Sequence, residues 1–262
     1  YSVAQSIGTY STGVNLSGVR SGYAGSVQTK GIAIASIETK QKKWSAALWN
    51  YWLENTMNTV YGQGTINMMQ TSKGGLSVGW QFGRQDRIQN GGNAAAALRY
   101  YEGSGSTTAG LRFEYQFPKG MVNLNVNWIS SEGRWLFPRE WGREPFFTFM
   151  ARERKEGSGN TFAISSNVQI QFPKHWQIHS AIGHYWMPGV TEFRLNKYGI
   201  GNYLQYNLQI KHQFSGNWKG LEWIGMLVAK WDTGATYLQP KYIYNRVNLV
   251  HFNVIFNYDL PL

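Results

Sequence analysis

The sequence contains no cysteine, and only 15% of its 262 residues are charged. The absence of cysteine excludes a disulfide framework, a thiolate metal site and a cysteine nucleophile. The low charge is unusual, because soluble domains carry roughly 25% charged residues. The chain also lacks any apolar run near the ~20 residues that a membrane helix needs. These absences exclude a helical membrane protein and disfavour an ordinary cytosolic protein.

Recognisable catalytic motifs are absent as well. The sequence contains no GxSxG elbow, no HExxH pair and no P-loop. His175 and His179 fall on one face of a predicted strand, but four residues of strand separate them by roughly 13 Å, too far to share a metal ion. We therefore predict no enzymatic activity, no metal and no cofactor. The net charge of +11 is scattered singly rather than clustered on one face, so no nucleic-acid partner is predicted.

The sequence is rich in aromatic residues (16%) and contains 30 glycines. Polar and apolar positions alternate strictly along much of the chain. The clearest case is the segment 122–128, in which apolar side chains alternate with Asn123, Asn125 and Asn127. A period of two produces one apolar face only in a β-strand. The polar positions hold Asn, Gln, Ser and Gly rather than the Lys and Glu of an ordinary protein surface. This composition favours strands with lipid on one side and a watered lumen on the other.

The pattern predicts twelve strands from Gly31 onward, one of them over Asn93–Tyr101, and two more before Gly31, one near Thr12–Val19. Connections 117–120, 172–175 and 214–218 are short, whereas 131–161, 187–199 and 232–245 are long. Alternating short turns and long loops are typical of outer-membrane barrels. We therefore predict an all-β protein: a transmembrane, antiparallel, up-and-down β-barrel of 12–14 strands, forming one domain over residues 1–262. The loop 131–161 is then extracellular and is expected to fold toward the pore.

This loop interrupts the alternation and concentrates charge, with six basic residues and five glutamates in residues 131–160. Its phenylalanines are too apolar for a free loop, so it must pack against another part of the chain. Two interpretations remain open: a constriction whose charges select solutes, or a cap whose charges pair with one another and hold its shape. The second is favoured, because charge networks more often maintain shape than perform chemistry. The loop candidates are Arg139, Glu140, Arg143, Glu144, Arg152, Glu153 and Arg154.

Several motifs resemble the OprD family of outer-membrane porins. They are LFPREWGREPFFTF at 136–149, RERKEG at 152–157, WSAALWNYW at 44–52, NKYG at 196–199 and the end of the chain at 247–260. The block at 136–157 is the specific one. The resemblance implies a barrel of about 18 strands, so an N-terminal portion is expected to be missing here. It also implies a selective channel for amino acids, peptides or small carboxylates, with basic residues on one wall opposite an acidic constriction loop.

Strand parity supplies the candidates for the pore lining, because a charge is costly against lipid and cheap in a watered lumen. A role in solute transit and a simple ion pair on the wall, such as Arg112 beside Glu114, both remain open. The candidates are Arg99, Arg112, Glu114, Asn123, Asn125, Asn127, Lys211, Glu222 and Lys230.

We therefore predict an integral outer-membrane porin for passive, partly selective diffusion of small hydrophilic solutes, with outer-membrane lipid around it. One alternative is a barrel that acts as a scaffold and docks other envelope proteins. A less favoured alternative is an outer-membrane hydrolase, which would need a Ser/His/carboxylate cluster that the sequence does not show.

Overall fold

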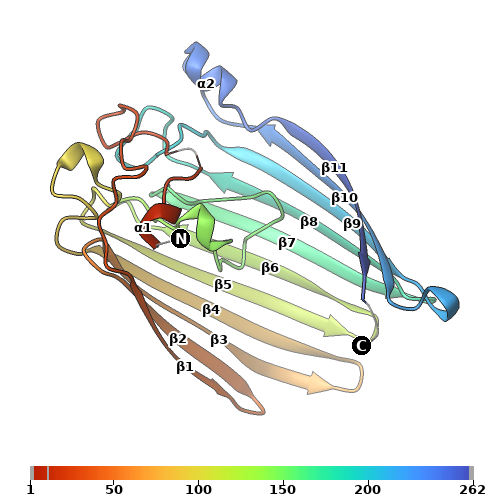
Figure 1. Cartoon of the computed structure of the whole chain (residues 1–262). Coiled ribbons are helices and arrows are strands. Elements are labelled where there is room, and N and C mark those ends of the chain that lie inside the picture. Colours follow the sequence, from red (N-terminus) through yellow and green to blue (C-terminus); the bar gives the residue numbers. More distant parts are fainter. Residues whose placement is uncertain (1–2, 11, 260–262) are drawn as a thin grey trace.

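The computed structural model describes residues 3–10 and 12–259, and its fold is a single antiparallel sheet (Figure 1). Each strand pairs with its neighbours in the sequence, in the order β1 to β11. The strands are β1 (Ile32–Lys40), β2 (Trp44–Leu53), β3 (Met57–Thr71), β4 (Gly74–Arg87), β5 (Gly105–Phe117), β6 (Gly120–Ile129), β7 (Thr161–Phe172), β8 (Trp176–Trp186), β9 (Tyr203–Gln213), β10 (Leu221–Asp232) and β11 (Leu249–Tyr258).

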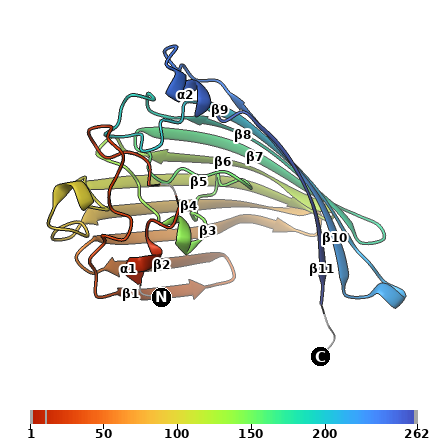
Figure 2. The same cartoon turned by 45° about the horizontal axis from the view of Figure 1, so that its top comes forward.

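The sheet curves into an open trough, and β1 and β11 are not paired with each other among the described residues (Figure 2). Helical segments are short: α1 (Val3–Ser6), η1 (Ala96–Leu98), η2 (Arg139–Trp141), η3 (Gly216–Trp218) and α2 (Pro240–Tyr244). Within the described part of the chain, no helix has the length and apolar character needed to cross a membrane. The all-β, up-and-down architecture predicted from the sequence is confirmed.

The two ends of the sheet differ in their connections. At the turn end, the strands are joined by short segments: 41–43, 72–73, 118–119, 173–175 and 214–220. At the loop end, the connections 88–104, 130–160, 187–202 and 233–248 are long, and only 54–56 is short. The predicted alternation of short and long connections therefore holds, with the β2–β3 connection as its exception.

The pairing register of neighbouring strands places polar side chains on one face of the sheet and apolar side chains on the other. In the β5–β6 pair, Arg112 lies opposite Asn125 and Phe113 lies opposite Leu124, so polar pairs and apolar pairs alternate along the ladder. Leu124 is 45% exposed on the convex face, whereas Asn125 is fully buried on the concave face. The predicted orientation of the three asparagines toward the inside is confirmed. Apolar side chains stay exposed because nothing in the described chain covers the convex face.

The strand predicted over 93–101 and the two predicted before Gly31 are wrong, and the described strands number eleven rather than twelve to fourteen. Residues 93–101 form the loop around η1, because the run of alanines there has no alternation to give it two faces. Residues 12–19 form a tight turn instead: the side chain of Asn15 accepts hydrogen bonds from the N–H groups of Ser17 (3.0 Å) and Val19 (2.9 Å). Such side-chain bonds compete with a strand ladder. In the last predicted strand, Leu260 lies outside the described residues.

Candidate functional site

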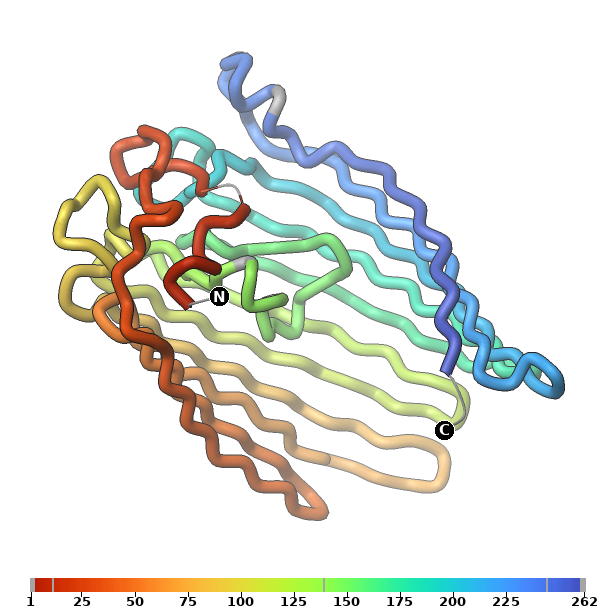
Figure 3. Tube along the Cα trace, viewed as in Figure 1, coloured from red at the N-terminus to blue at the C-terminus, as the bar shows by residue number. Residues whose placement is uncertain are grey.

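The segment 131–160, here called the inner loop, lies in the hollow of the trough over the middle strands (Figure 1, Figure 3). Its two ends are joined by backbone hydrogen bonds, from Trp135 N–H to the carbonyl of Ser158 (2.9 Å) and from Gly157 N–H to the carbonyl of Trp135 (2.7 Å). The residues between them form a closed lobe that contains η2. The prediction that this loop must pack against another part of the chain is therefore correct.

Glutamines on the concave face hold the backbone of the inner loop. Gln85 illustrates the contact: its Oε1 accepts from Leu136 N–H (2.8 Å), and its Nε2 donates to the carbonyl of Leu136 (2.7 Å). A side-chain amide can bond in this way to both the backbone N–H and the backbone carbonyl of one residue, as a neighbouring strand would. Two other glutamines also bond to the loop backbone. Gln81 accepts from Phe147 N–H (2.9 Å) and donates to the carbonyl of Pro145 (2.7 Å), and Gln205 donates to the carbonyl of Ala151 (2.7 Å).

Glycines on the same face make room for the large side chains of the inner loop. A Cβ at Gly83 would lie 2.6 Å from Cη2 of Trp135, which is 1% exposed. A Cβ at Gly79 would lie 3.0 Å from Cζ of Phe147. These separations are shorter than van der Waals contact, so only glycine leaves space for the rings. The sheet thus carries recesses that match the side chains of the loop.

A buried lysine lies between the inner loop and the sheet. The ammonium of Lys155 donates to Thr148 Oγ1 (2.7 Å) and to Asn127 Oδ1 on β6, and lies 4.3 Å from the centre of the Phe146 ring. The carboxylate of Glu144 accepts from the backbone N–H of Lys155 (3.1 Å). Burial, followed by the charge of Glu153, raises the pKa of Glu144 to about 8, and burial lowers the pKa of Lys155 to about 8.

Glu153 fixes the far side of the loop to β9 and β10. Its carboxylate accepts from the hydroxyl of Tyr203 (3.0 Å), whose ring stacks on Tyr185 at 4.6 Å. Lys230 of β10 donates to the carbonyl of Arg152 beside it. Burial raises the pKa of Glu153 as well. The loop therefore contacts the wall from β4 to β10.

A buried ion pair joins the inner loop to the segment 187–202. Lys197 Nζ and Glu156 Oε1 are 2.8 Å apart with side chains nearly inaccessible to solvent, and the Tyr198 hydroxyl donates to the same carboxylate (2.6 Å). The ring of Tyr23 lies 5.0 Å from the ammonium. Burial alone would lower the pKa of Lys197, but it is raised because Glu156 is so close. Sequence reasoning did not predict Lys197, since pairing between distant loops leaves no periodic signal.

Four of the five glutamates of the inner loop are buried or half-buried. Glu140 accepts from the N–H groups of Gly8 (3.1 Å) and Tyr10 (3.3 Å), and the exposed Glu132 is paired with Arg84. Among the basic residues of the loop, Arg134 and Lys155 are buried, whereas Arg143 and Arg152 have exposed side chains. Arg154 donates to the carbonyl of Gly142 (2.8 Å). The side chain of Arg139 lies outside the described residues.

The predicted wall residues of β5 and β6 lie together on the concave face. Arg112 Nε donates to Asn125 Oδ1 (2.7 Å), and its guanidinium lies 4.2 Å from the centre of the Phe147 ring. Asn125 in turn donates to Asn123 Oδ1 (2.8 Å). Glu114 lies nearer the turn end, where it accepts from Gln116 Nε2 (2.8 Å) rather than pairing with Arg112.

Lys211 and Glu222 form an ion pair across β9 and β10 on the concave face. Lys230 lies on the same face of β10, nearer the loop end and buried under the inner loop. The prediction for Arg99 is wrong. It follows η1 in the loop 88–104, and its guanidinium donates to the carbonyls of Asn93 (3.1 Å) and Ala94 (3.0 Å), so it does not belong to the wall.

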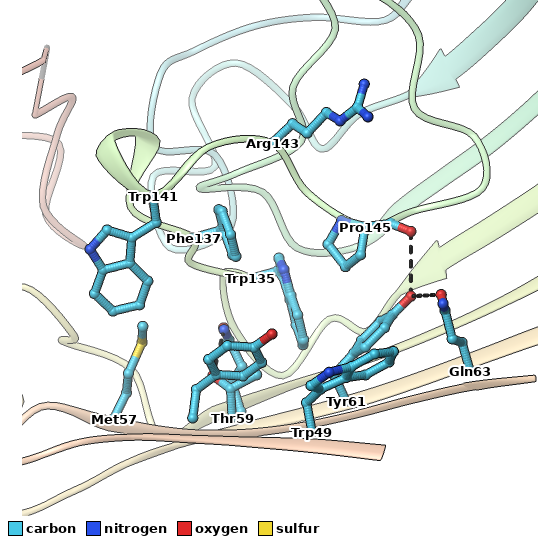
Figure 4. A pocket seen from close by; sticks show the side chains of 12 residues that line it. Trp49, Met57, Thr59, Tyr61, Gln63, Trp135, Phe137, Trp141, Arg143 and Pro145 are labelled. Carbon is cyan, nitrogen blue, oxygen red and sulfur yellow. Dashed lines mark hydrogen bonds between the residues drawn. The ribbon is translucent and has the colours of Figure 1, made fainter. Parts of the chain in front are cut away.

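A cavity of about 290 Å³ separates the inner loop from β2 and β3 (Figure 4). Aromatic side chains from both sides face it. They include Trp49, Tyr51 and Tyr61 from the strands and Trp135, Phe137 and Trp141 from the loop. The alternation of the strands carries no signal that the loop would lie above these side chains.

No family profile and no curated protein matches this chain. Its structure, however, is similar to solved structures. OccAB4 of Acinetobacter baumannii has a TM-score of 0.70 at 10% identity over 88% of this chain and 53% of that one. OccK9 (OpdG) of Pseudomonas aeruginosa has 0.67 at 10% identity over 88% and 54%. The outer membrane protein OprD from Pseudomonas aeruginosa has 0.63 at 14% identity over 86% and 58%.

This chain thus spans between half and three fifths of the length of those three proteins. The similarity extends over most of this chain. The chain has the fold of the OprD and Occ outer-membrane porins, as the resemblance in its sequence predicts.

Proposed function

We propose that this protein is an integral outer-membrane channel for passive diffusion of small hydrophilic solutes such as amino acids, peptides or small carboxylates. One observation carries the proposal: apolar side chains cover the convex face, polar side chains cover the concave face, and a folded loop lies in the hollow. An exposed apolar face of this extent needs lipid as its solvent. A polar concave face next to it supports a watered passage.

The long connections would lie on the extracellular side, as in outer-membrane barrels generally. The inner loop would then narrow the passage from that side. Its attachment to β4–β10 through buried contacts supports a fixed constriction rather than a free flap.

The exposed arginines of the inner loop support a preference for anionic groups. Four of its five glutamates are buried or half-buried and Glu132 is paired with Arg84, whereas Arg143 and Arg152 are exposed. A solute that passes this surface would meet guanidinium groups, which bind carboxylates through paired hydrogen bonds. In this respect the loop differs from the acidic constriction that the sequence resemblance implies.

Planar-bilayer recording of the purified full-length protein tests the proposal. We expect ion conductance, with a reversal potential in a KCl gradient that favours Cl⁻. The double change Arg143→Glu and Arg152→Glu should move the reversal potential toward K⁺. A matched control is Lys42→Glu with Lys73→Glu, which reverses two exposed charges in the short turns. Absence of conductance would contradict the channel, and an equal shift in both double variants would contradict the role of the loop arginines.

A further inference from the structure

The cavity between the inner loop and β2–β3 has aromatic walls on two sides (Figure 4). On the strand side, the rings of Trp49 and Tyr61 lie 5.8 Å apart and are tilted by 33°. On the loop side, Phe137 and Trp141 lie 6.3 Å apart in an edge-to-face arrangement. Ring pairs at these separations leave faces and edges to which another aromatic ring can add.

The amides that line the cavity have partners within the protein. Gln85 is bonded to Leu136 through both of its amide atoms and also donates to Thr59 Oγ1 (3.0 Å). Gln63 Oε1 accepts from Gln81 Nε2 (3.3 Å) and lies 3.4 Å from the Tyr61 hydroxyl. The indole N–H of Trp135 is buried without a partner among the described residues. A sugar ring needs several hydrogen-bonding groups around its edge, and the amide of Gln85 and the oxygen of Gln63 are engaged elsewhere. The lining therefore suits an apolar ring better than a pyranose.

Charge is also absent from the aromatic part of the cavity. Arg143 is the one charged residue that lines it among the described residues. Its guanidinium points away from the rings in Figure 4 and lies 5.6 Å from the centre of the Phe149 ring. A carboxylate beside the tryptophans would have no cation to face. The size of the cavity, about 290 Å³, is at the lower end of the ~300–1,000 Å³ of small-molecule sites.

We infer that this cavity binds one uncharged aromatic ring, supplied by a small neutral aromatic molecule. The ring would lie between the strand pair Trp49–Tyr61 and the loop pair Phe137–Trp141. Such a ligand differs from the hydrophilic solutes of the proposed channel. The site does not depend on conduction, so its binding and the channel activity are measured separately.

The experiment is a titration of the purified full-length protein in detergent micelles with fluorobenzyl alcohol, followed by fluorine NMR. Micelles without protein give the baseline. We expect saturable binding above that baseline. Fluorophenylacetate, which adds a carboxylate to the same ring, should bind no more tightly, and glucose should not displace the alcohol.

Variants place the ligand. Trp49→Leu and Trp141→Leu should each weaken binding by about three- to tenfold, the loss of one ring–ring contact. Trp49→Phe should retain most of the affinity. Trp52→Leu is the matched control, because Trp52 is on the same strand with its side chain on the convex face. Since Trp141 belongs to the loop and Trp49 to the sheet, a folding defect in one variant leaves the other informative.

Four results would overturn the inference. They are the absence of saturable binding, equal weakening by Trp52→Leu, binding of fluorophenylacetate without binding of the alcohol, and displacement by glucose. None of these results bears on the conductance of the wild-type protein, which tests the proposed channel separately.

Discussion

The recess at Gly83 allows one quantitative test of how the inner loop is held. In Gly83→Ala, the new Cβ would lie 2.6 Å from Trp135 Cη2 and 2.8 Å from Thr108 Cγ2. Two responses are possible. The side chains can shift slightly, at about 1–3 kcal/mol for an overpacked site. Alternatively, Trp135 can leave the recess, which exposes ~150–250 Å² of ring surface and costs about 4–6 kcal/mol at ~25 cal/mol per Å².

The smaller cost decides the outcome. We expect the inner loop to stay in place but to open more readily, with its docking weakened by about 1–3 kcal/mol. Hydrogen exchange measures this opening at the amides of Trp135 and Leu136, which are bonded to Ser158 and Gln85. Their exchange should accelerate by about 5- to 150-fold, since 1.4 kcal/mol corresponds to a factor of ten.

The control is Gly62→Ala on the convex face of β3, where the nearest atoms to a new Cβ are 3.5 Å away. Exchange at Trp135 and Leu136 should change little in this variant. Equal acceleration in both variants, or none in Gly83→Ala, would refute the recess as a determinant of loop position.

Three further predictions concern the buried charges. Lys155→Met removes the buried ammonium that donates to Thr148 and Asn127, so loop docking should weaken by about 1–3 kcal/mol, because two buried acceptors lose their donor. Exchange of the loop amides measures the loss, and unchanged exchange would refute the role of the lysine. Because the pKa of Glu144 is raised to about 8 from ~4.3 in an open loop, docking should lose stability as pH rises from about 4.5 to 8, after correction for intrinsic exchange rates. Glu144→Gln should remove that decline, and a decline that persists would assign it to other groups. Lys197→Met should lower the thermal stability of the loop end by leaving Glu156 buried beside no ammonium, a cost of about 3–5 kcal/mol, whereas Lys241→Met, at an exposed lysine, should have little effect in the same melting experiment.

The sequence predicts the sheet well because each strand carries its own evidence. The alternation in 122–128 defines the strand and both of its faces, so the three asparagines are correctly placed on the concave side. The same rule fails at Arg99, where it predicts a strand over a run of alanines that forms a loop. There the side chain of Arg99 bonds to nearby carbonyls, a local interaction that period-two patterns do not describe.

Contacts between the loop and the sheet could not be predicted in the same way. In the sequence, Gln85 and Gly83 are an ordinary polar and an ordinary small residue of a strand. The structure shows that Gln85 bonds to Leu136 and that Gly83 leaves space for the Trp135 ring. From the sequence, the five glutamates of the inner loop are nearly balanced by its six basic residues, and nothing indicates which of these charges are buried. The burial of Glu153 and Glu156 and the contacts of Glu140 depend on partners far away in the sequence.

The central claim is that the concave face borders a water-filled passage and the convex face borders lipid. Because the chain has no cysteine, single cysteines can be introduced without background. Gln169 and Ile170 are neighbours on β7 whose side chains point to opposite faces. During planar-bilayer recording, a cationic, membrane-impermeant thiol reagent should reduce conductance through Gln169→Cys and leave Ile170→Cys unchanged. Reduced conductance through Ile170→Cys alone, or an equal effect on both, would contradict the assignment of the two faces.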